Sequence, residues 1–348
     1  MLRILGLRHL ACAFCALFLI LPGPPEAEAF RGTPKWTFET GSPVSGSPKI
    51  VGSSLCIGDS SGKLHSLDKT TGRLQWSFST GSTIIGSPAV SGDTIFIGGG
   101  GTLFALDAGT GLEKWRFQAS EDFSIWSSPE TCQGLICFST TGGTIYAVDA
   151  KNGSPAWTFD TGKELPSAPA CSEGLVFVGS SDGIFSALDG KTGRKAWGGG
   201  SGGAVGQAAV SSGVVFFGSE DGLLQAVRIQ GVRPLWKFSA GEAVTTRPVP
   251  SGDRVFFGTI TGRLVAVDAS TGRKVWEYVS PGGIHSAPVV AEGLVFSGSD
   301  RGTLHGVDSA AGNRVWSFDS DREILSDPAW EGGVLYFGSY DGKVYAFE

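Results

Sequence analysis

The sequence is poor in charged side chains and has no run of basic residues. Asp, Glu, Lys and Arg make up 17% of its 348 residues, whereas about a quarter is usual. The formal net charge is −6. Domains that bind nucleic acids normally carry a basic patch or stripe, so the sequence argues against that class of function.

The chain also lacks a segment long enough to span a membrane in the mature protein. The apolar stretch LACAFCALFLIL follows Arg3 and Arg8 and is shorter than the roughly 20 residues of a spanning helix. Ala-Glu-Ala at 27–29 fits the small-residue rule for cleavage. We expect residues 1–29 to be a signal peptide and the mature chain to begin at Phe30, as a soluble, exported, periplasmic protein; an uncleaved anchor is the alternative.

Cysteine is sparse and follows no metal-binding spacing. Cys12 and Cys15 lie in the apolar stretch, and neither looks like a lipoprotein cleavage site. An even number of further cysteines in an exported chain permits disulfides. These four are Cys56, Cys132, Cys137 and Cys171. A bridge between Cys132 and Cys137 across one short turn and burial as small apolar residues on strands are the alternatives.

Catalytic signatures are missing as well. The glycine runs GGGG (98–101) and GGGSGG (198–203) lack the following helix and the Gly-Lys-Ser/Thr of a phosphate-binding loop. We expect turns or flexible loops there. No Ser/His/Asp or Cys/His arrangement stands at a spacing typical of nucleophilic catalysis.

What the chain does contain is a repeat of about 40 residues, which is the first feature to establish in any fold prediction. Tryptophan recurs at intervals of 39 to 42 residues, at Trp36, Trp76, Trp115, Trp157, Trp197, Trp236, Trp276 and Trp316. Proline keeps the same spacing at Pro48, Pro88, Pro129, Pro169, Pro248, Pro288 and Pro328, with Ala208 in the missing place. A third marker is aspartate, at Asp68, Asp107, Asp149, Asp189, Asp268 and Asp308, with Arg228 and Glu348 as variants.

Each repeat predicts one small four-stranded antiparallel sheet. In 87–118, apolar residues alternate in short runs that are separated by glycine-rich turns. One such sheet cannot bury both of its faces, but a radial arrangement lets neighbours cover each other, as in a β-propeller. The first repeat begins with a lone fourth strand at 34–38, and the last, 326–347, has only three. We therefore predict an all-β domain over 30–348, with eight blades and a ring closed by the N-terminal strand.

The repeated motif carries a resemblance to a known family. ALDAGTGLEKW (105–115), ALDGKTGRKAW (187–197) and AVDASTGRKVW (266–276) resemble the tryptophan-docking motif of the pyrroloquinoline-quinone-like eight-bladed propellers, and GSSDG, GSEDG and GSYDG resemble its second hairpin. The resemblance implies that the tryptophans dock one blade on the next. It leaves function open, because the superfamily contains both quinoprotein dehydrogenases and non-enzymatic scaffolds.

Two classes of function follow from this resemblance. The plain build is similar to the periplasmic propeller lipoprotein that supports outer-membrane β-barrel assembly, which implies a scaffold in an envelope protein complex. The alternative, a dehydrogenase, implies pyrroloquinoline quinone and Ca²⁺ at the centre. The chain lacks the adjacent cysteines and the long inserts of such enzymes, and it has no evident acidic cluster for Ca²⁺. We therefore favour a scaffold without metal or cofactor.

Small-ligand binding in the central channel is a third hypothesis. Residues immediately before the proline marker begin the innermost strand, and six of the eight are polar. Gln207, Arg247 and Asp327, with Trp126 and His285 nearby, are candidate ligand contacts. The alternative is that polar residues line a wet channel without a ligand. His65 and His305 share one repeat position, which we expect to be a half-exposed strand site rather than a metal site.

Blade five departs most from the repeat. It lacks the proline and the aspartate, and RIQGVRPLW (228–236) replaces the Thr-Gly turn. A partner surface that includes Arg228 and Arg233 would account for this departure, and neutral drift in a blade that still folds is the alternative.

Overall fold

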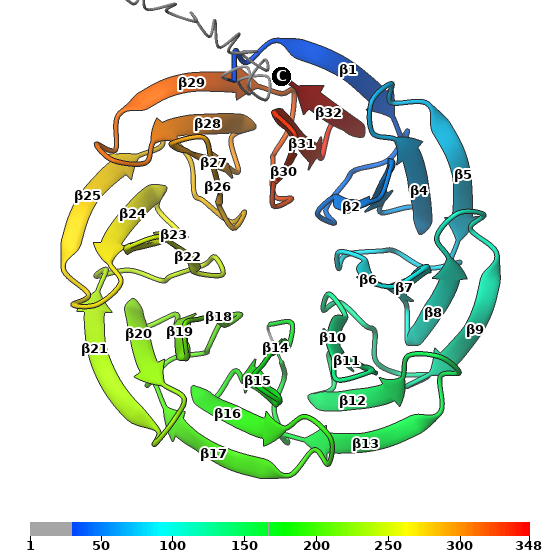
Figure 1. The fold of residues 1–348 in the computed structure, drawn as a ribbon, viewed down its shortest axis with the longest axis horizontal. Helices are drawn as coiled ribbons and strands as arrows, with labels where there is room; N and C mark the ends of the chain where they lie inside the picture. The colour runs from blue at the N-terminus through cyan, green and yellow to red at the C-terminus, as the bar shows by residue number, and fades with distance from the viewer. Residues whose placement is uncertain (1–29, 166) are drawn as a thin grey trace, which may run out of the picture.

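The computed structural model describes residues 30–165 and 167–348, which form a ring of eight sheets around a central channel (Figure 1). Each sheet contains four antiparallel strands, which in seven of the sheets follow chain order from the channel to the rim; the eighth takes its rim strand from the start of the domain. The predicted all-β, eight-bladed propeller is confirmed. In this part of the chain, no helix is long and apolar enough to cross a membrane.

The strands of the first four blades have the following bounds. Blade 1 contains β2 (Lys49–Val51), β3 (Ser54–Gly58), β4 (Lys63–Asp68) and β5 (Leu74–Ser79). Blade 2 contains β6 (Ala89–Ser91), β7 (Thr94–Gly99), β8 (Thr102–Asp107) and β9 (Glu113–Gln118). Blade 3 contains β10 (Glu130–Cys132), β11 (Leu135–Ser139), β12 (Thr144–Asp149) and β13 (Pro155–Asp160). Blade 4 contains β14 (Ala170–Ser172), β15 (Leu175–Gly179), β16 (Ile184–Asp189) and β17 (Lys195–Gly200).

The remaining blades follow the same plan. Blade 5 contains β18 (Ala209–Ser211), β19 (Val214–Gly218), β20 (Leu223–Arg228) and β21 (Arg233–Ser239). Blade 6 contains β22 (Val249–Ser251), β23 (Arg254–Gly258), β24 (Arg263–Asp268) and β25 (Lys274–Val279). Blade 7 contains β26 (Val289–Ala291), β27 (Leu294–Gly298), β28 (Thr303–Asp308) and β29 (Arg314–Asp319). Blade 8 contains β30 (Ala329–Glu331), β31 (Val334–Ser339), β32 (Lys343–Phe347) and, from the other end of the chain, β1 (Pro34–Glu39).

The ring closes as predicted, with β1 as the outer strand of blade 8. β1 runs antiparallel to β32, and Trp36 lies opposite Ala346. Beyond the paired strands, the backbones of Thr33 and Glu348 exchange two hydrogen bonds of 2.9 Å each. No blade among the described residues is therefore left with three strands.

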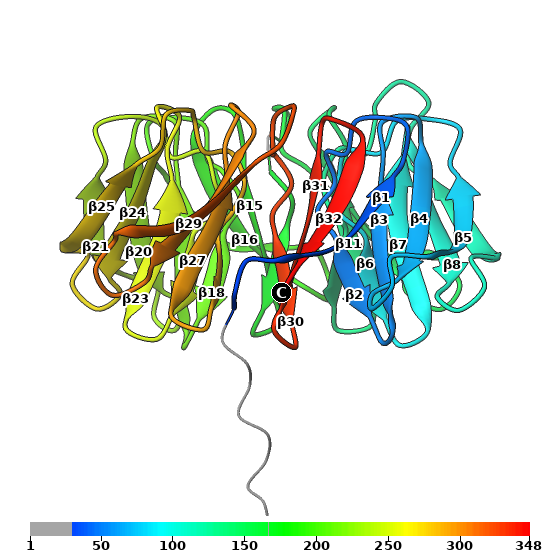
Figure 2. The ribbon, with the colours of Figure 1, turned by 90° about the horizontal axis from the view of Figure 1, so that it is seen from above.

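The burial of each strand reflects its place in the blade. All residues of β7 are buried, whereas β9 alternates between half-buried and exposed residues. Neighbouring blades cover both faces of the middle strands, while the outer strand has one face toward solvent, which gives the period of two. In side view the strands span the disc, with the β31–β32 turn at the upper face and the β30–β31 turn at the lower face (Figure 2).

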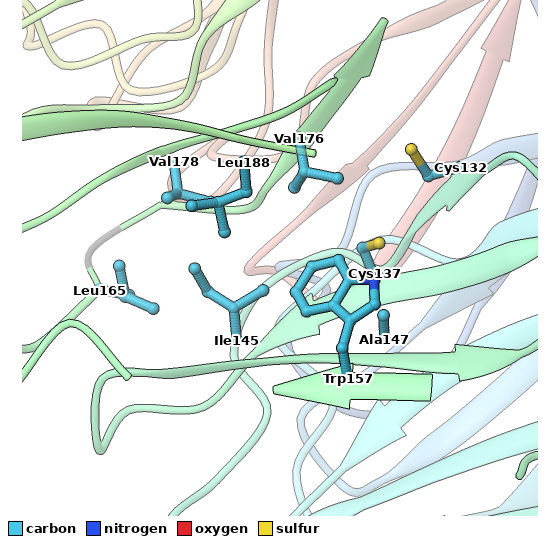
Figure 3. Packing of buried hydrophobic residues seen from close by; sticks show 9 residues of the cluster. All are labelled: Cys132, Cys137, Ile145, Ala147, Trp157, Leu165, Val176, Val178 and Leu188. Carbon is cyan, nitrogen blue, oxygen red and sulfur yellow. The ribbon is translucent and has the colours of Figure 1, made fainter. Parts of the chain in front are cut away.

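The tryptophans pack between blades. Trp157 of β13 lies between Ala147 of its own blade and Val176 of blade 4 in a shared apolar cluster (Figure 3). Its indole Nε1 donates a hydrogen bond of 2.9 Å to the carbonyl of Gly190 in blade 4. Equivalent bonds are made by Trp36, Trp76, Trp236 and Trp276. Trp115 departs from the pattern, since its buried Nε1 has no acceptor among the described residues.

The Asp-x-x-Thr-Gly turn prepares the surface on which the preceding tryptophan docks. Asp189 accepts hydrogen bonds from the backbone N–H and the hydroxyl of Thr192. Gly193 then takes a left-handed conformation, with φ of 68°, and its missing side chain leaves room for the ring of Trp157. The repeated sequence is thus a docking device between blades.

Both glycine runs differ from the prediction of turns or loops. Residues 98–99 belong to β7 and residues 198–200 to β17, so only the later part of each run forms a connection. The backbone of each strand continues its ladder, with Phe185 opposite Gly199, because pairing needs no side chain.

Candidate functional site: the central channel

The residues before the proline marker form the waist of the central channel. The ring consists of Ser47, Ser87, Ser128, Ala168, Gln207, Arg247, Ala287 and Asp327. A cavity of about 360 Å³ lies on one side of it and a cavity of about 540 Å³ on the other. All six polar members of the ring border both cavities.

Half of this ring is tied together by hydrogen bonds between blades. The backbone N–H of Ala287 donates to Asp327 Oδ1 at 2.6 Å, and the N–H of Asp327 donates to the Ser47 hydroxyl at 2.9 Å. The chain of bonds continues from Ser47 to the Ser87 hydroxyl and from Ser87 to the Ser128 hydroxyl. Each side chain satisfies a backbone group of the preceding blade, so these four side chains have a structural role whatever the channel binds.

The other half of the ring contains the free polar groups. Ala168 has no side-chain acceptor to offer, and the side chain of Gln207 makes no hydrogen bond with any residue that the structure describes. Arg247 makes neither a hydrogen bond nor an ion pair within the described residues, although it is half-buried. Gln207 and Arg247 are therefore the waist residues with donors available to a ligand.

Charges of both signs surround Arg247. Asp327 lies deep in the channel, and burial raises the pKa of its carboxyl group. The positive charge of Arg247 and the hydrogen bond from the N–H of Ala287 oppose this rise. Burial likewise raises the pKa of Glu130 on β10, against the effect of Lys49 and Arg247. A ligand that fits this waist would be polar and would contact Arg247, whose charge also acts on Glu130 and Asp327.

Trp126 and His285 line the cavity of about 360 Å³, which lies toward the upper face and is called the upper cavity. The cavity of about 540 Å³ on the other side of the waist is the lower cavity. Trp126 is 57% exposed, and it belongs to the connection between β9 and β10. His285 Nε2 stands 3.9 Å from a carboxylate oxygen of Asp300 in the same blade. The structure thus brings all five candidate ligand contacts to the cavities around the waist.

The channel does not offer a calcium site of the quinoprotein kind. Ca²⁺ takes six to eight oxygen ligands, and the described residues contain no group of three or more His, Cys, Asp or Glu close enough to hold a metal ion. The carboxyl groups of Glu130 and Asp327 interact with Arg247, and burial raises their pKa values. The residues present do not fit quinone with calcium.

The structure excludes the Cys132–Cys137 bridge, one of the two alternatives that the sequence left open, and bears out burial for two of the cysteines. Cys132 is bonded to Cys171, on the first strand of the next blade, and not to Cys137. Pairing of β10 with β11 places Glu130 opposite Cys137 and Leu135 opposite Cys132, so the two cysteines of the hairpin are out of register. Cys56 and Cys137 are buried free thiols, and Cys171 borders the lower cavity.

The two histidines at one repeat position are buried, which contradicts the prediction of half-exposed sites. His65 is 5% exposed and lies 2.8 Å from Asp59 through Nε2. His305 is 1% exposed and contacts the hydroxyls of Tyr278 and Ser280. Their shared position faces the preceding blade, where Phe38 packs against His65 and Tyr278 against His305. Both ring nitrogens of His305 have hydrogen-bond partners, whereas Nδ1 of His65 has none among the described residues.

Arg228 and Arg233 lie far from the channel. Arg228 ends β20 and Arg233 begins β21, and they are opposite each other in the ladder. Both are exposed. They sit at the outer part of blade 5, where the Thr-Gly turn is replaced.

These features define an eight-bladed β-propeller of the pyrroloquinoline-quinone-like type, with a polar channel and no metal-holding cluster among the described residues. The sequence matches the family model of the outer membrane protein assembly factor BamB at residues 27–132, 127–238 and 220–348. The chain belongs to this family. No curated protein matches its sequence.

Solved structures share the fold. BamB from Moraxella catarrhalis is 21% identical, with a TM-score of 0.80 over 91% of this chain and 99% of that one. A computationally designed protein, Ika8, is 19% identical, with a TM-score of 0.77 over 92% and 98%. Quinohemoprotein alcohol dehydrogenase from Comamonas testosteroni is 15% identical, with a TM-score of 0.73 over 90% of this chain and 76% of the enzyme.

Proposed function

We propose that this protein is an exported, non-enzymatic scaffold that acts in outer-membrane protein assembly. The observation that carries the proposal is the family match, whose three segments together extend along the whole propeller. The chain also covers 99% of the Moraxella BamB structure but 76% of the alcohol dehydrogenase. The scaffold would work in the periplasm as part of the outer-membrane β-barrel assembly machinery.

The upper face supplies apolar side chains for docking. Phe123 and Trp126, on the connection between β9 and β10, are 49% and 57% exposed. Ile260, in the β23–β24 turn on the same face, is 49% exposed. Aromatic residues that are exposed on loops of a rigid disc are typical anchors of protein interfaces.

The test is in-envelope cross-linking of the tagged protein, followed by mass spectrometry of what is recovered. We expect stoichiometric recovery of an outer-membrane β-barrel assembly protein, and a Phe123→Ser/Trp126→Ala variant should recover several-fold less. A Val279→Ser/Val315→Ser variant is the matched control, because it removes exposed apolar side chains from the rim. Recovery of no assembly protein would refute the proposal.

A second candidate function is binding of a small polar or anionic ligand in the channel. Arg247 and Gln207 favour it, because both line the channel and neither side chain makes a hydrogen bond with the described residues. Thermal shift with a panel of small carboxylates and phosphates tests this, since a ligand that binds only the folded protein raises Tm. The shift should vanish in Arg247→Gln. A dye-linked dehydrogenase assay with added pyrroloquinoline quinone and Ca²⁺ separates this candidate from an enzyme.

A further inference from the structure

One interface between blades lacks an aromatic residue that the other seven have. Two residues after each docking tryptophan the chain places an aromatic ring on the outer strand: Phe38, Phe78, Phe117, Phe159, Phe238, Tyr278 and Phe318. In blade 4 the equivalent residue is Gly199 on β17.

The seven aromatic residues share one packing position. Phe78 meets Phe104 of the next blade edge-on, with 5.4 Å between ring centroids. Phe238 meets Phe257 in the same way at 5.9 Å. The ring therefore fills the outer part of the gap between two blades. At Gly199 an added Cβ would find nothing within 4 Å, so none of the described residues occupies the start of this side-chain position.

The consequence is an apolar groove between blades 4 and 5, with a volume of about 200 Å³. Its lining includes Trp197, Phe217, Val232 and Pro234. Phe217 stacks on Phe185 with ring centroids 4.0 Å apart, which forms a flat aromatic floor. The lining residues come from β17 and from β20 and β21; in Figure 1, β17 and β21 are the rim strands of adjacent blades, and β20 lies inward of β21.

The groove also contains an unsatisfied hydrogen-bond donor. Gln225 on β20 lines it and is 5% exposed, and its buried Nε2 has no partner among the described residues. A buried amide without a partner destabilises the fold, so an acceptor from outside would stabilise the interface.

Another interface of the same molecule shows which side chain reaches the equivalent place, and a tyrosine hydroxyl can accept a hydrogen bond as well as donate one. Tyr278 occupies the aromatic position in blade 6, and its hydroxyl lies 3.1 Å from Nδ1 of His305 in blade 7. His305 and Gln225 hold equivalent places on the third strands of their blades. A tyrosine ring in the groove would meet Phe217 with its face or edge and Gln225 with its hydroxyl.

The surroundings favour an acidic, extended segment. β17 is the outermost strand of its sheet, so part of its backbone is unpaired, and three consecutive glycines leave that edge without side chains. Lys195 and Lys237 flank the groove, and Arg228 and Arg233 adjoin lining residues. None of the four cations makes an ion pair within the described residues.

We propose that this groove is a docking site for an extended, acidic segment of a partner protein, which inserts a tyrosine side chain at the place that Gly199 leaves empty. The segment pairs with the edge of β17 while its tyrosine completes the interface between blades 4 and 5. This site is separate from the channel and the upper face, and it does not depend on the role in outer-membrane assembly.

The test uses three synthetic peptides with the sequence Glu-Thr-Glu-Thr-X-Thr-Glu-Thr-Glu, where X is Tyr, Phe or Ala. Their affinities for the purified protein are measured by fluorescence anisotropy. We expect the Tyr peptide to bind at least about tenfold more tightly than the Ala peptide, as burial of one aromatic ring predicts. The Phe peptide should fall between them, because it leaves Gln225 unsatisfied.

Two variants locate the site. Gly199→Tyr supplies the missing ring from within the chain, so it should raise Tm and reduce binding of the Tyr peptide to that of the Ala peptide. Ala196→Tyr, an exposed substitution on the same strand outside the groove, is the control and should leave binding unchanged. Gln225→Leu should abolish the preference for Tyr over Phe.

The proposal is overturned if the three peptides bind equally or not at all, or if the Tyr peptide binds Gly199→Tyr as it binds the unmodified protein. Charge reversal in Arg228→Glu/Arg233→Glu should weaken the Tyr peptide several-fold at low salt and less at high salt. An effect of the same size at both salt concentrations would contradict the electrostatic part.

Discussion

Gly193 lies so close to the indole of Trp157 that a Cβ on this glycine would stand 2.6 Å from ring atom Cδ2. The same contact recurs between Gly72 and Trp36 and between Gly272 and Trp236. The tryptophan of each preceding blade thus leaves no room for a side chain at the glycine of the next blade. Blade 5 breaks this relationship, since Gly231 has nothing within 4 Å of its Cβ position.

Replacement of Gly193 by alanine should therefore destabilise the propeller. A left-handed residue with a side chain costs about 1–2 kcal/mol, and the clash with Trp157 adds about 1–3 kcal/mol. We expect the free energy of unfolding in urea to fall by both contributions. Gly231→Ala is the matched control, because φ is 77° there but the space is open, so only the first cost applies. Equal losses in the two variants would show that tryptophan docking contributes nothing.

Removal of the Cys132–Cys171 disulfide should lower stability substantially. The bond closes a loop with a sequence separation of 39, for which the chain-entropy relation gives about 4 kcal/mol. The double variant Cys132→Ser/Cys171→Ser should lose Tm relative to the oxidised protein. Reductant should lower the Tm of the unmodified protein and leave that of the variant unchanged. A reductant effect on the variant would place the sensitive bond elsewhere.

The two free thiols should resist alkylation in the folded protein. Burial raises the pKa of Cys56 to about 11 and that of Cys137 to about 12, and the thiolate is the reactive form. Iodoacetamide at neutral pH should label neither residue under native conditions and both after unfolding. Rapid native labelling of one of them, located by mass spectrometry, would show that its blade interface opens.

Acid should destabilise the protein in part through His305. Burial lowers its pKa to about 4, with a further contribution from Arg314 and an opposing one from Asp319. Unfolded histidine takes up its proton near pH 6.5, so the unfolded state binds more protons between about pH 6.5 and 4. This contribution to unfolding is absent above that window and grows as the pH falls through it.

The effect is measurable as a difference in slope. Near pH 5 it amounts to about 2 kcal/mol. His305→Gln should lose less stability than the unmodified protein between about pH 7.5 and 5 in urea titrations. The absolute stability of the variant is not the readout, because the contacts to Tyr278 and Ser280 change at every pH. Parallel pH profiles would assign the acid sensitivity to other groups.

The architecture was predictable because three residue types repeat with one spacing and the two ends are complementary. The period of 40 gave eight blades, and the lone strand at 34–38 matches β1, whose bounds are Pro34–Glu39. These features depend on local alternation and turn chemistry, which a sequence displays directly.

Contacts between blades were harder to predict, although two had a visible signal. Cys132 is the last residue of one first strand and Cys171 the middle residue of the next, 39 positions apart. A comparison of aligned repeats would have placed both cysteines on adjacent first strands. Gly199 is the single interruption of the aromatic series two residues after each tryptophan. Burial of His65 and His305 depends on what the adjacent blade places opposite them, and the repeat pattern alone does not contain that information.

Closure by β1 also determines when the fold can be completed. The outer strand of blade 8 comes from the beginning of the chain and its inner three strands come from the end, so a chain whose last residues are still to be synthesised has no finished last blade. The two blades beside it, blades 1 and 7, each keep one uncovered flank until Phe347 pairs beside Pro34. The interval between the arrival of the first and the last strand is therefore the period in which the chain most needs protection from proteases and from self-association.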